Sequence, residues 1–257
     1  MSELTGANVD SGFYAACAGL RSQSEALEVS GHNLANLNTA GFRGEQTTFQ
    51  SLVAASRPTV PNVLNLATNN FGVLEGTHLD LTAGNLEKTG NPLDVAIEGS
   101  GFFAIQTARG TRYTRNGSFQ VSSAGQLVTQ AGDLVLSNFK LKEKGAISVP
   151  AGVVSIEPDG TLSVNGAVAG NIQLVDFAPG TPLTPEGGSV LAAPEGSAQP
   201  TQQSQLKQGA LESSNVNPIT SVVTLIGVQR EAEMLQRCMS LFDTEFNHIA
   251  STDLAKV

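Results

Sequence analysis

Residues 225–249 read LIGVQREAEMLQRCMSLFDTEFNHI, and their apolar side chains recur with a heptad spacing. Two series, offset by three positions, each repeat every seven residues: Leu225, Ala232, Met239 and Phe246, and Val228, Leu235, Phe242 and Ile249. Eight of the other 17 positions are Gln, Arg, Glu or Asp, so we interpret the apolar stripe as narrow, which is typical of a coiled-coil seam. Asn217 and Pro218 just upstream suit an N-cap and a first helical turn. The pattern predicts a C-terminal helix that packs through this seam.

The N-terminal segment shows a weaker form of the same pattern. Its large apolar residues recur every seven positions: Phe13, Leu20, Leu27 and Leu34. The companion positions hold the small residues Cys17, Ser24 and Gly31, which would let a neighbouring helix approach closely. Asn38 or Gly41 is a candidate left-handed cap that ends this helix. We expect the two terminal helices to pair antiparallel within one chain or to pack against neighbouring copies; packing of each helix on the middle of the chain is the alternative.

The middle of the chain consists of short apolar runs separated by turn signals such as Asn116-Gly117 and Asn165-Gly166. Gly and Asn tolerate the positive φ angles that tight hairpin turns require. Closely spaced strands without helices between them indicate an antiparallel β domain. The predicted strands are 93–98, 102–107, 117–121, 126–129, 133–136, 146–149, 153–156, 161–164 and 172–177.

These patterns together predict an α+β fold. Its N- and C-terminal α-helices form a coiled-coil-like helical domain, and its middle forms a mainly antiparallel β domain. We expect residues 1–50 and 205–257 to make the discontinuous helical domain, 51–75 an extended connector, and 76–204 the β-rich outer domain. Within the last of these, the Pro- and Gly-rich residues 178–204 read as a long loop.

The composition argues against several kinds of partner. The 257 residues include 14 Lys+Arg and 23 Asp+Glu, a net charge of −9, and no basic run, so nucleic acid is a poor candidate. The sequence contains no run of about 18 apolar residues, so we expect no membrane span. The first ten residues lack a positively charged start followed by an apolar run, so we expect no cleaved secretory signal.

No group of residues in the sequence indicates catalysis or cofactor binding. Cys17 and Cys238 lie near opposite ends and are expected to be free thiols, and the three histidines are isolated, so we expect no metal site. Ser100 between two glycines reads as a hairpin turn, because it lacks the spacing of a nucleophile elbow. Asp94 and Glu98 would share one face of a strand and are expected to be solvated. We therefore predict that the chain is not an enzyme.

Four blocks of the sequence resemble the bacterial flagellar axial proteins and, among them, the basal-body rod protein family. SGHNLANLNTAGFR at 30–43 is similar to the family's N-terminal signature, a helix ending in Asn-Asn-Leu-Ala-Asn followed by Thr-x-Gly-Phe-Lys/Arg, with His32 replacing an Asn. Residues 93–103 resemble its first β motif, 113–119 its hairpin signature, and 213–218 with Gln229-Arg230 the start of its C-terminal helix. The residues that match the family motif at the two ends of the chain are Asn33, Leu34, Ala35, Asn36, Thr39, Gly41, Phe42, Asn215, Asn217, Gln229 and Arg230.

The resemblance implies a structural subunit of the flagellar rod, with terminal helices in the core of a tube and the β domain outside. Such a subunit would assemble helically and transmit torque from the motor to the hook. The chain looks most like the proximal-rod members; a distal-rod or other axial, hook-type protein is the alternative. The assembly interface would be formed by the heptad residues Phe13, Leu20, Leu27, Leu34, Leu225, Val228, Ala232, Leu235, Met239, Phe242, Phe246 and Ile249.

The resemblance also implies partners and a location. The partners would be copies of this chain, other rod subunits, neighbouring basal-body proteins and the flagellar type III export apparatus. The location would be the rod that spans the periplasm, reached without a cleaved signal. A secreted β-rich adhesin or polysaccharide-acting enzyme is the rival class. The enzyme would need a carboxylate cluster and surface aromatics, whereas the chain has no Trp and two Tyr, and the adhesin would not need a helix at each end.

Overall fold

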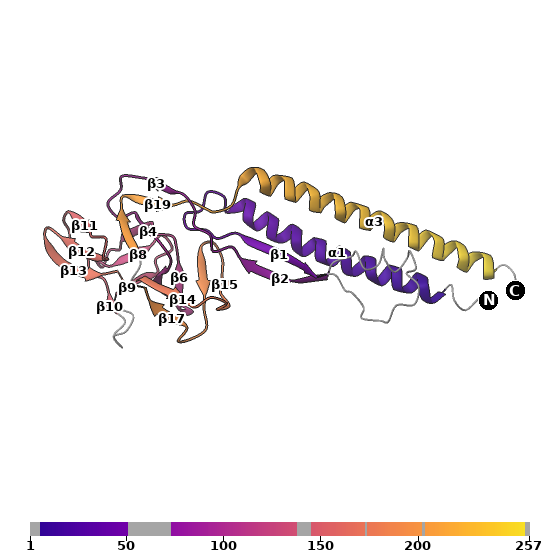
Figure 1. Cartoon of the computed structure of the whole chain (residues 1–257), viewed down its shortest axis with the longest axis horizontal. Helices are drawn as coiled ribbons and strands as arrows, with labels where there is room; N and C mark the ends of the chain where they lie inside the picture. The colour runs from indigo at the N-terminus through magenta and orange to yellow at the C-terminus, as the bar shows by residue number, and fades with distance from the viewer. Residues whose placement is uncertain (1–5, 51–72, 138–144, 173, 202–203, 255–257) are drawn as a thin grey trace. The chain divides into compact units, whose positions relative to one another are not determined.

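Two long helices flank a large antiparallel β region in the sequence, which makes the fold α+β. The computed structural model describes residues 6–50, 73–137, 145–172, 174–201 and 204–254. It divides into two compact units (Figure 1). The helical unit contains α1 (Gly6–Ala35), α3 (Pro218–Leu254) and the strands β1 (Glu45–Gln50) and β2 (Val73–Leu79), and the β unit contains residues 36–44 and 79–216.

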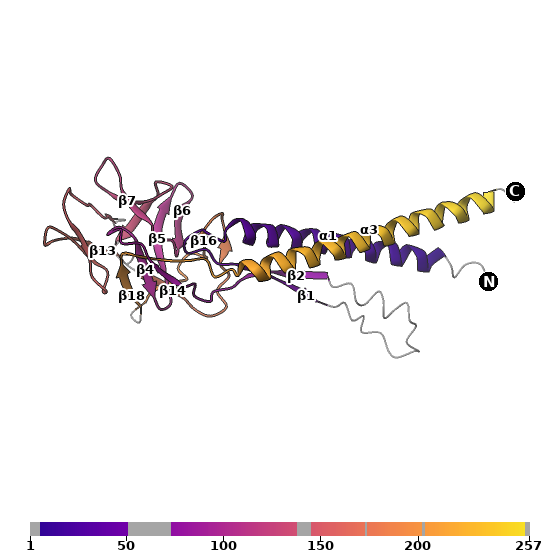
Figure 2. The same cartoon turned by 90° about the horizontal axis from the view of Figure 1, so that it is seen from above.

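In the helical unit, α1 and α3 lie side by side and run in opposite directions, as Figures 1 and 2 both show. This is the antiparallel pairing expected from the sequence. α1 also contacts β1, which pairs with β2. The predicted connector at 51–75 lies almost wholly outside the described residues.

The predicted coiled-coil-like domain is wrong. A heptad seam interlocks large side chains from both helices, but within residues 16–35, where the side chains of α1 are described, the buried positions are small: Ala16, Gly19, Ser22, Ala26 and Ser30. The large residues Leu20, Leu27 and Leu34 are only half-buried. On α3 only Leu235 is fully buried among the described seam side chains, at 3% exposure. The two helices therefore pack through a small-residue face of α1 rather than through two matched rows of large side chains.

In the β unit, every strand pair for which the structure gives a register is antiparallel. Its main sheet has ten strands, in the order β15-β16-β6-β5-β9-β8-β7, with β10 on β9, β14 on β5 and β17 on β14. A separate sheet has the order β11-β12-β13, and two further pairs are β18-β4 and β19-β3. The strands are β3 (Leu86–Lys88), β4 (Val95–Glu98), β5 (Phe102–Thr107), β6 (Gly110–Thr114), β7 (Phe119–Val121), β8 (Leu127–Thr129), β9 (Leu134–Ser137), β10 (Gly145–Ala146), β11 (Val154–Ile156), β12 (Thr161–Val164), β13 (Ala167–Asn171), β14 (Leu174–Phe177), β15 (Thr184–Pro185), β16 (Val190–Ala192), β17 (Ala198–Pro200), β18 (Gln205–Gln208) and β19 (Ala210–Glu212).

Strand β5 lies between two hydrophobic clusters. Phe103 and Ile105 point into one cluster, and Phe102 and Ala104 into the other, because successive side chains of a strand face opposite sides. The ring of Phe103 packs edge-on against that of Phe119 at a centroid distance of 5.0 Å. Burial on both faces explains why this strand is a continuous apolar run rather than an alternating one.

Several segments differ from the sequence expectation. Residues 36–44, expected in the helical domain, belong to the β unit, and β6 and β13 lie outside the predicted strands. Residues 178–204, expected to be one long loop, include the short strands β15, β16 and β17. Residues 205–212, expected in the helical domain, form β18 and β19, which pair with β4 and β3 of the β unit. The C-terminal segment thus completes the β unit before α3 begins.

Candidate assembly site

A buried cluster of three charged side chains holds together distant parts of the β unit. The Glu212 carboxylate accepts hydrogen bonds from Arg43 Nη2 at 2.7 Å and from Arg115 Nη1 at 3.0 Å. It also accepts one from the backbone N–H of Gly84 at 2.8 Å. The three side chains are between 1% and 5% exposed. We call Arg43, Arg115 and Glu212 the arginine–glutamate cluster.

The cluster contains two cations and one anion. Burial lowers the pKa of Arg115, and the nearby Arg43 charge acts in the same direction, whereas Glu212 opposes it. Arg115 also donates from Nη2 to the carbonyl of Gly99 at 2.8 Å, and its guanidinium lies 5.4 Å from the ring centroid of Phe102. The cluster therefore depends on Glu212 for its charge compensation, since removing one partner of a buried pair leaves an uncompensated charge.

The family-motif residues beside the cluster join the same chain segments. The Asn215 side chain accepts from the N–H of Gly44 at 2.8 Å and donates to the carbonyl of Asp80 at 2.8 Å. Phe42 is 2% exposed. Gly41 has φ +65°, and a Cβ there would lie 2.3 Å from the carbonyl carbon of Arg115, so no other residue fits without movement. Residues 39–44 and 210–216, far apart in sequence, are thus fixed against each other.

Other motif residues shape the ends of the helices. In the helical unit, the Asn33 side chain makes two hydrogen bonds to the backbone of Glu45, one to its carbonyl at 2.7 Å and one from its N–H at 2.9 Å. Asn217 caps α3 as predicted, because its side-chain oxygen accepts from the N–H of Ile219 at 2.9 Å. In the β unit, Thr39 donates to the Asn36 side chain at 3.1 Å. Of the remaining motif residues, Leu34 is half-buried and Ala35, Gln229 and Arg230 are exposed.

The predicted interface residues differ in accessibility. Leu235 is buried, and the other described members are half-buried: Leu20, Leu27, Leu34, Leu225, Val228, Ala232 and Met239. The side chains of Phe13, Phe242, Phe246 and Ile249 lie outside the described part of the chain. The structure brings the described members together on α1 and α3 within one unit, and their part in assembly stays a prediction.

Sequence reasoning missed the cluster itself. Arg43 and Arg115 were quoted only as members of motifs, and Glu212 was not singled out. Nothing local marks the pairing, because Arg43 and Glu212 are 169 residues apart. The one available signal is that both arginines lie next to motif residues with strict backbone requirements, Gly41 and Asn116-Gly117.

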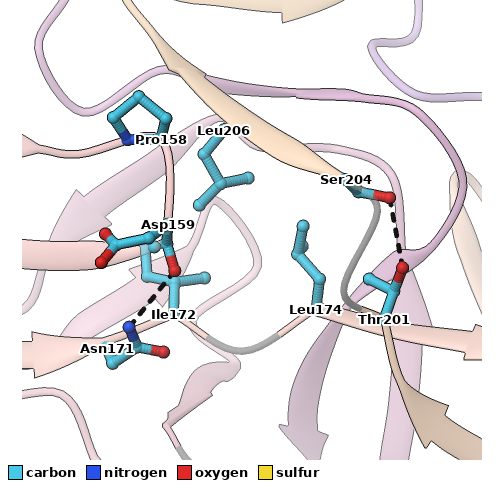
Figure 3. A pocket seen from close by; sticks show the side chains of 9 residues that line it. Pro158, Asp159, Asn171, Ile172, Leu174, Thr201, Ser204 and Leu206 are labelled. Carbon is cyan, nitrogen blue, oxygen red and sulfur yellow. Dashed lines mark hydrogen bonds between the residues drawn. The ribbon is translucent and has the colours of Figure 1, made fainter.

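A cavity of about 200 Å³ in the β unit offers no catalytic arrangement (Figure 3). Figure 3 shows Asp159 and the Thr201–Ser204 pair on opposite sides of the apolar side chains Ile172, Leu174 and Leu206. The Asp159 carboxylate accepts from the backbone N–H of Thr161 at 2.9 Å, and this hydrogen bond lowers the pKa of Asp159. A carboxylate held in its ionised form, without a second acid or base beside it, is a turn residue rather than an acid–base catalyst.

Within the described ranges, no three His, Cys, Asp or Glu side chains are placed to hold a metal ion. Cys17 and Cys238 are free thiols and half-buried. No helix in the part of the chain that the structure describes has the length and apolarity needed to cross a membrane.

A buried cluster that joins distant chain segments in one unit and two paired terminal helices in the other are features typical of a structural protein. Models of two families match: the flagellar hook protein FlgE/F/G D1 domain over residues 96–164 and the flagellar basal body rod FlgEFG protein C-terminal domain over residues 207–244. The flagellar basal-body rod protein FlgF of Caulobacter vibrioides is 32% identical over 90% of this chain and 93% of its own length. FlgG of Buchnera aphidicola is 31% identical over 88% of this chain and 93% of its own length. FlgF of Escherichia coli is 30% identical over 91% of this chain and 95% of its own length.

The chain therefore belongs to the flagellar basal-body rod protein family. This confirms the resemblance drawn from the sequence. The relatives are structural rod proteins, so the chain is a structural component of the flagellar basal body and not an enzyme.

Proposed function

We propose that this chain is a subunit of the basal-body rod that assembles helically and transmits torque from the motor to the hook. The observation that carries the proposal is similarity to rod proteins over nine-tenths of the chain, together with the match of residues 207–244 to the rod protein C-terminal domain. A subunit that carries torque needs a stiff connection between the segments that enter and leave its β unit. The arginine–glutamate cluster supplies such a connection, because Glu212 bonds to three separate segments in a buried environment.

The terminal segments 1–50 and 205–257 would supply the rod core, and residues 76–204 the outer domain. The half-buried heptad residues are the natural contacts with neighbouring subunits, because they keep apolar area that the single chain does not cover. Contacts of this kind use different surfaces on the two copies. They repeat by a helical operator rather than closing into a dimer.

The proposal extends to partners and route. The chain would contact copies of itself, other rod subunits and neighbouring basal-body proteins, and it would reach the periplasm-spanning rod through the flagellar type III export apparatus. A net charge of −9 and a composition without a predicted membrane span fit a chain that is exported and then assembled with protein partners.

A position in the proximal rod, as in proteins named FlgF, is the first choice. The Asn-Val-Asn-Pro start of α3 and residues 145–160 resemble that branch most. A distal-rod position is the second candidate, because relatives named FlgG reach 31% identity over similar lengths.

Deleting the gene in the bacterium that encodes this chain tests the proposal. We expect non-motile cells whose basal bodies, imaged by electron cryotomography, lack part or all of the rod, with recovery when the wild-type gene is restored. The length of rod that remains distinguishes a proximal from a distal position. Normal swimming and complete rods in the deletion strain would contradict the proposal.

A further inference from the structure

The arginine–glutamate cluster contains more hydrogen-bond donors than acceptors. Arg43 binds Glu212 through Nη2, and Arg115 uses Nη1 for Glu212 and Nη2 for the carbonyl of Gly99. Three other nitrogen atoms, Nε and Nη1 of Arg43 and Nε of Arg115, are buried and have no hydrogen-bond partner in the described part of the chain. The two arginine side chains are only 2% and 5% exposed, so bulk water does not reach these donors.

The Glu212 carboxylate cannot supply all the missing acceptors. A carboxylate offers about four acceptor positions, and Glu212 already uses three of them, for Arg43, Arg115 and the backbone N–H of Gly84. One position is thus left for three nitrogen atoms. Buried donors without a partner are rare in folded proteins, and where they occur they indicate a bound water molecule or ion.

The charges of the cluster favour an ion over a water molecule. Two guanidinium groups face one carboxylate, which leaves an excess of one positive charge at a buried site. Asp176 also attracts Arg115, but its oxygens accept hydrogen bonds from Ser100 and from the backbone N–H of Phe177. A water molecule would supply acceptors without charge. An anion supplies both, and a buried charge is tolerated best when it is paired and hydrogen-bonded.

The surroundings of the cluster limit the size and the charge of this anion. The three side chains are 1–5% exposed, so an enclosed site of this kind admits only a small ion. Glu212 binds both arginines, and its charge would repel a doubly negative group such as sulfate or phosphate. A halide ion carries a single negative charge, is small, and accepts N–H groups from several directions.

We infer that the β unit binds one halide ion, chloride in ordinary buffers, at the N–H groups of Arg43 and Arg115 that Glu212 leaves free. The ion balances the charges of the cluster, with two positive charges against two negative ones. It thereby stabilises the joint between the chain segments that carry Arg43, Arg115 and Glu212. The site lies wholly within the β unit, so it does not depend on the proposed rod function.

Urea unfolding of the full-length chain at constant ionic strength tests the site. Chloride replaces gluconate stepwise, and near-ultraviolet circular dichroism reports the unfolding of the β unit. A ligand that binds only the folded state shifts the folding equilibrium by mass action. Each tenfold rise in chloride above its dissociation constant should therefore raise the folding equilibrium constant about tenfold. Equal unfolding midpoints in chloride and in gluconate would overturn the inference.

Three variants separate the site from general effects of salt. Arg43→Met removes one positive charge and two of the three unpartnered nitrogen atoms, so it should lose the chloride dependence. The matched control Arg112→Met removes a half-buried arginine of the β unit that pairs with Glu186, and it should keep that dependence. Glu212→Gln raises the excess to two positive charges, so chloride should act on it at a lower concentration. Chloride dependence that persists in Arg43→Met, is lost in Arg112→Met or weakens in Glu212→Gln would overturn the inference.

Bromide provides a measurement on the wild-type chain that does not depend on the folding of a variant. Bromide replaces chloride at halide sites and is located in crystals by its anomalous scattering. We expect an anomalous peak within hydrogen-bond distance of Arg43 or Arg115. Peaks at exposed surface positions only, or a water molecule without anomalous signal in the cluster, would overturn the inference. A deletion strain that still builds complete rods would instead contradict the proposed function and leave the halide site unaffected.

Discussion

Replacing Glu212 with glutamine should destabilise the β unit far more than any surface charge change. Glutamine has nearly the same shape and can still accept the hydrogen bond from Gly84, but it cannot compensate Arg43 and Arg115. Its amide group would place a donor where Arg115 Nη1 now finds an acceptor at 3.0 Å. The variant therefore leaves two buried guanidinium groups without their hydrogen-bonded counter-charge, and only the weaker attraction of Asp176 for Arg115 remains.

The size of the effect follows from the burial of the cluster. Breaking a buried ion pair by removing one partner costs about 3–5 kcal/mol, against a total stability of about 5–15 kcal/mol for a domain. With a urea dependence of about 2 kcal/mol per molar, the unfolding midpoint should fall by about 1.5–2.5 M. The matched control is Glu98→Gln. Glu98 pairs with Lys207 at 3.3 Å with both side chains about half exposed, so its loss should change stability by less than about 1 kcal/mol.

Near-ultraviolet circular dichroism during urea unfolding gives the readout. The chain has no Trp and two Tyr, and Tyr113 is buried with its ring 4.9 Å from that of Phe177, so it reports on packing in the β unit. Adding Arg43→Met to Glu212→Gln should restore part of the lost stability, because it removes one of the two uncompensated cations. If Glu212→Gln and Glu98→Gln shift the midpoint equally, the cluster does not stabilise the fold and the reasoning fails.

Three further predictions address other parts of the chain. Gly41→Ala should lower the urea midpoint much more than Gly132→Ala, because both have positive φ but only Gly41 faces backbone where a Cβ would lie; equal shifts would contradict the close packing. Leu235→Asp should remove much of the helical circular dichroism and prevent rod assembly in cells, since it puts a carboxylate at a 3% exposed position; Glu233→Asp is the control, and normal swimming of the Leu235 variant would refute the expectation. The hydrogen bond that Arg112 donates to Glu186 holds the pKa of this carboxyl below its usual range. The carboxylate therefore stabilises the folded state at neutral pH and loses that effect as the pH falls through the acid range. The melting temperature of Glu186→Gln should accordingly fall less on acidification than that of the wild type.

Local signals in the sequence predict much of the fold. The heptad spacing locates both helices, and the Asn165-Gly166 turn adopts the positive φ angles, +52° and +82°, that its residue types predict. The sequence did not predict strands β15 and β17, because each is only two or three residues long and ends in a proline, which signals a loop. These prolines are Pro185 and Pro200. Their partners, β16 and β14, are set by tertiary pairing that no local pattern encodes.

The error about the coiled coil has a similar cause. A heptad pattern identifies the apolar side of α3 but does not say what lies against it. The buried side of α1 consists of small residues such as Ala16, Ala26 and Ser30, which in a sequence look no different from exposed ones. Residue size and polarity thus predicted that α1 and α3 would pair, but they predicted the wrong face of α1.

The arginine–glutamate cluster could not be predicted from the sequence. Its geometry explains why charged residues are tolerated at this buried position. Apolar residues of similar volume could stabilise such a site equally well, but they would not select one register. Strand β19 has only three residues, with Glu212 opposite Leu86. A slip of two residues would keep the same side chains facing inward but move Glu212 by about 7 Å, beyond hydrogen-bond reach of both arginines. Glu212 therefore fixes the register of β19, and with it the position in the sequence at which the chain leaves the β unit and α3 can begin.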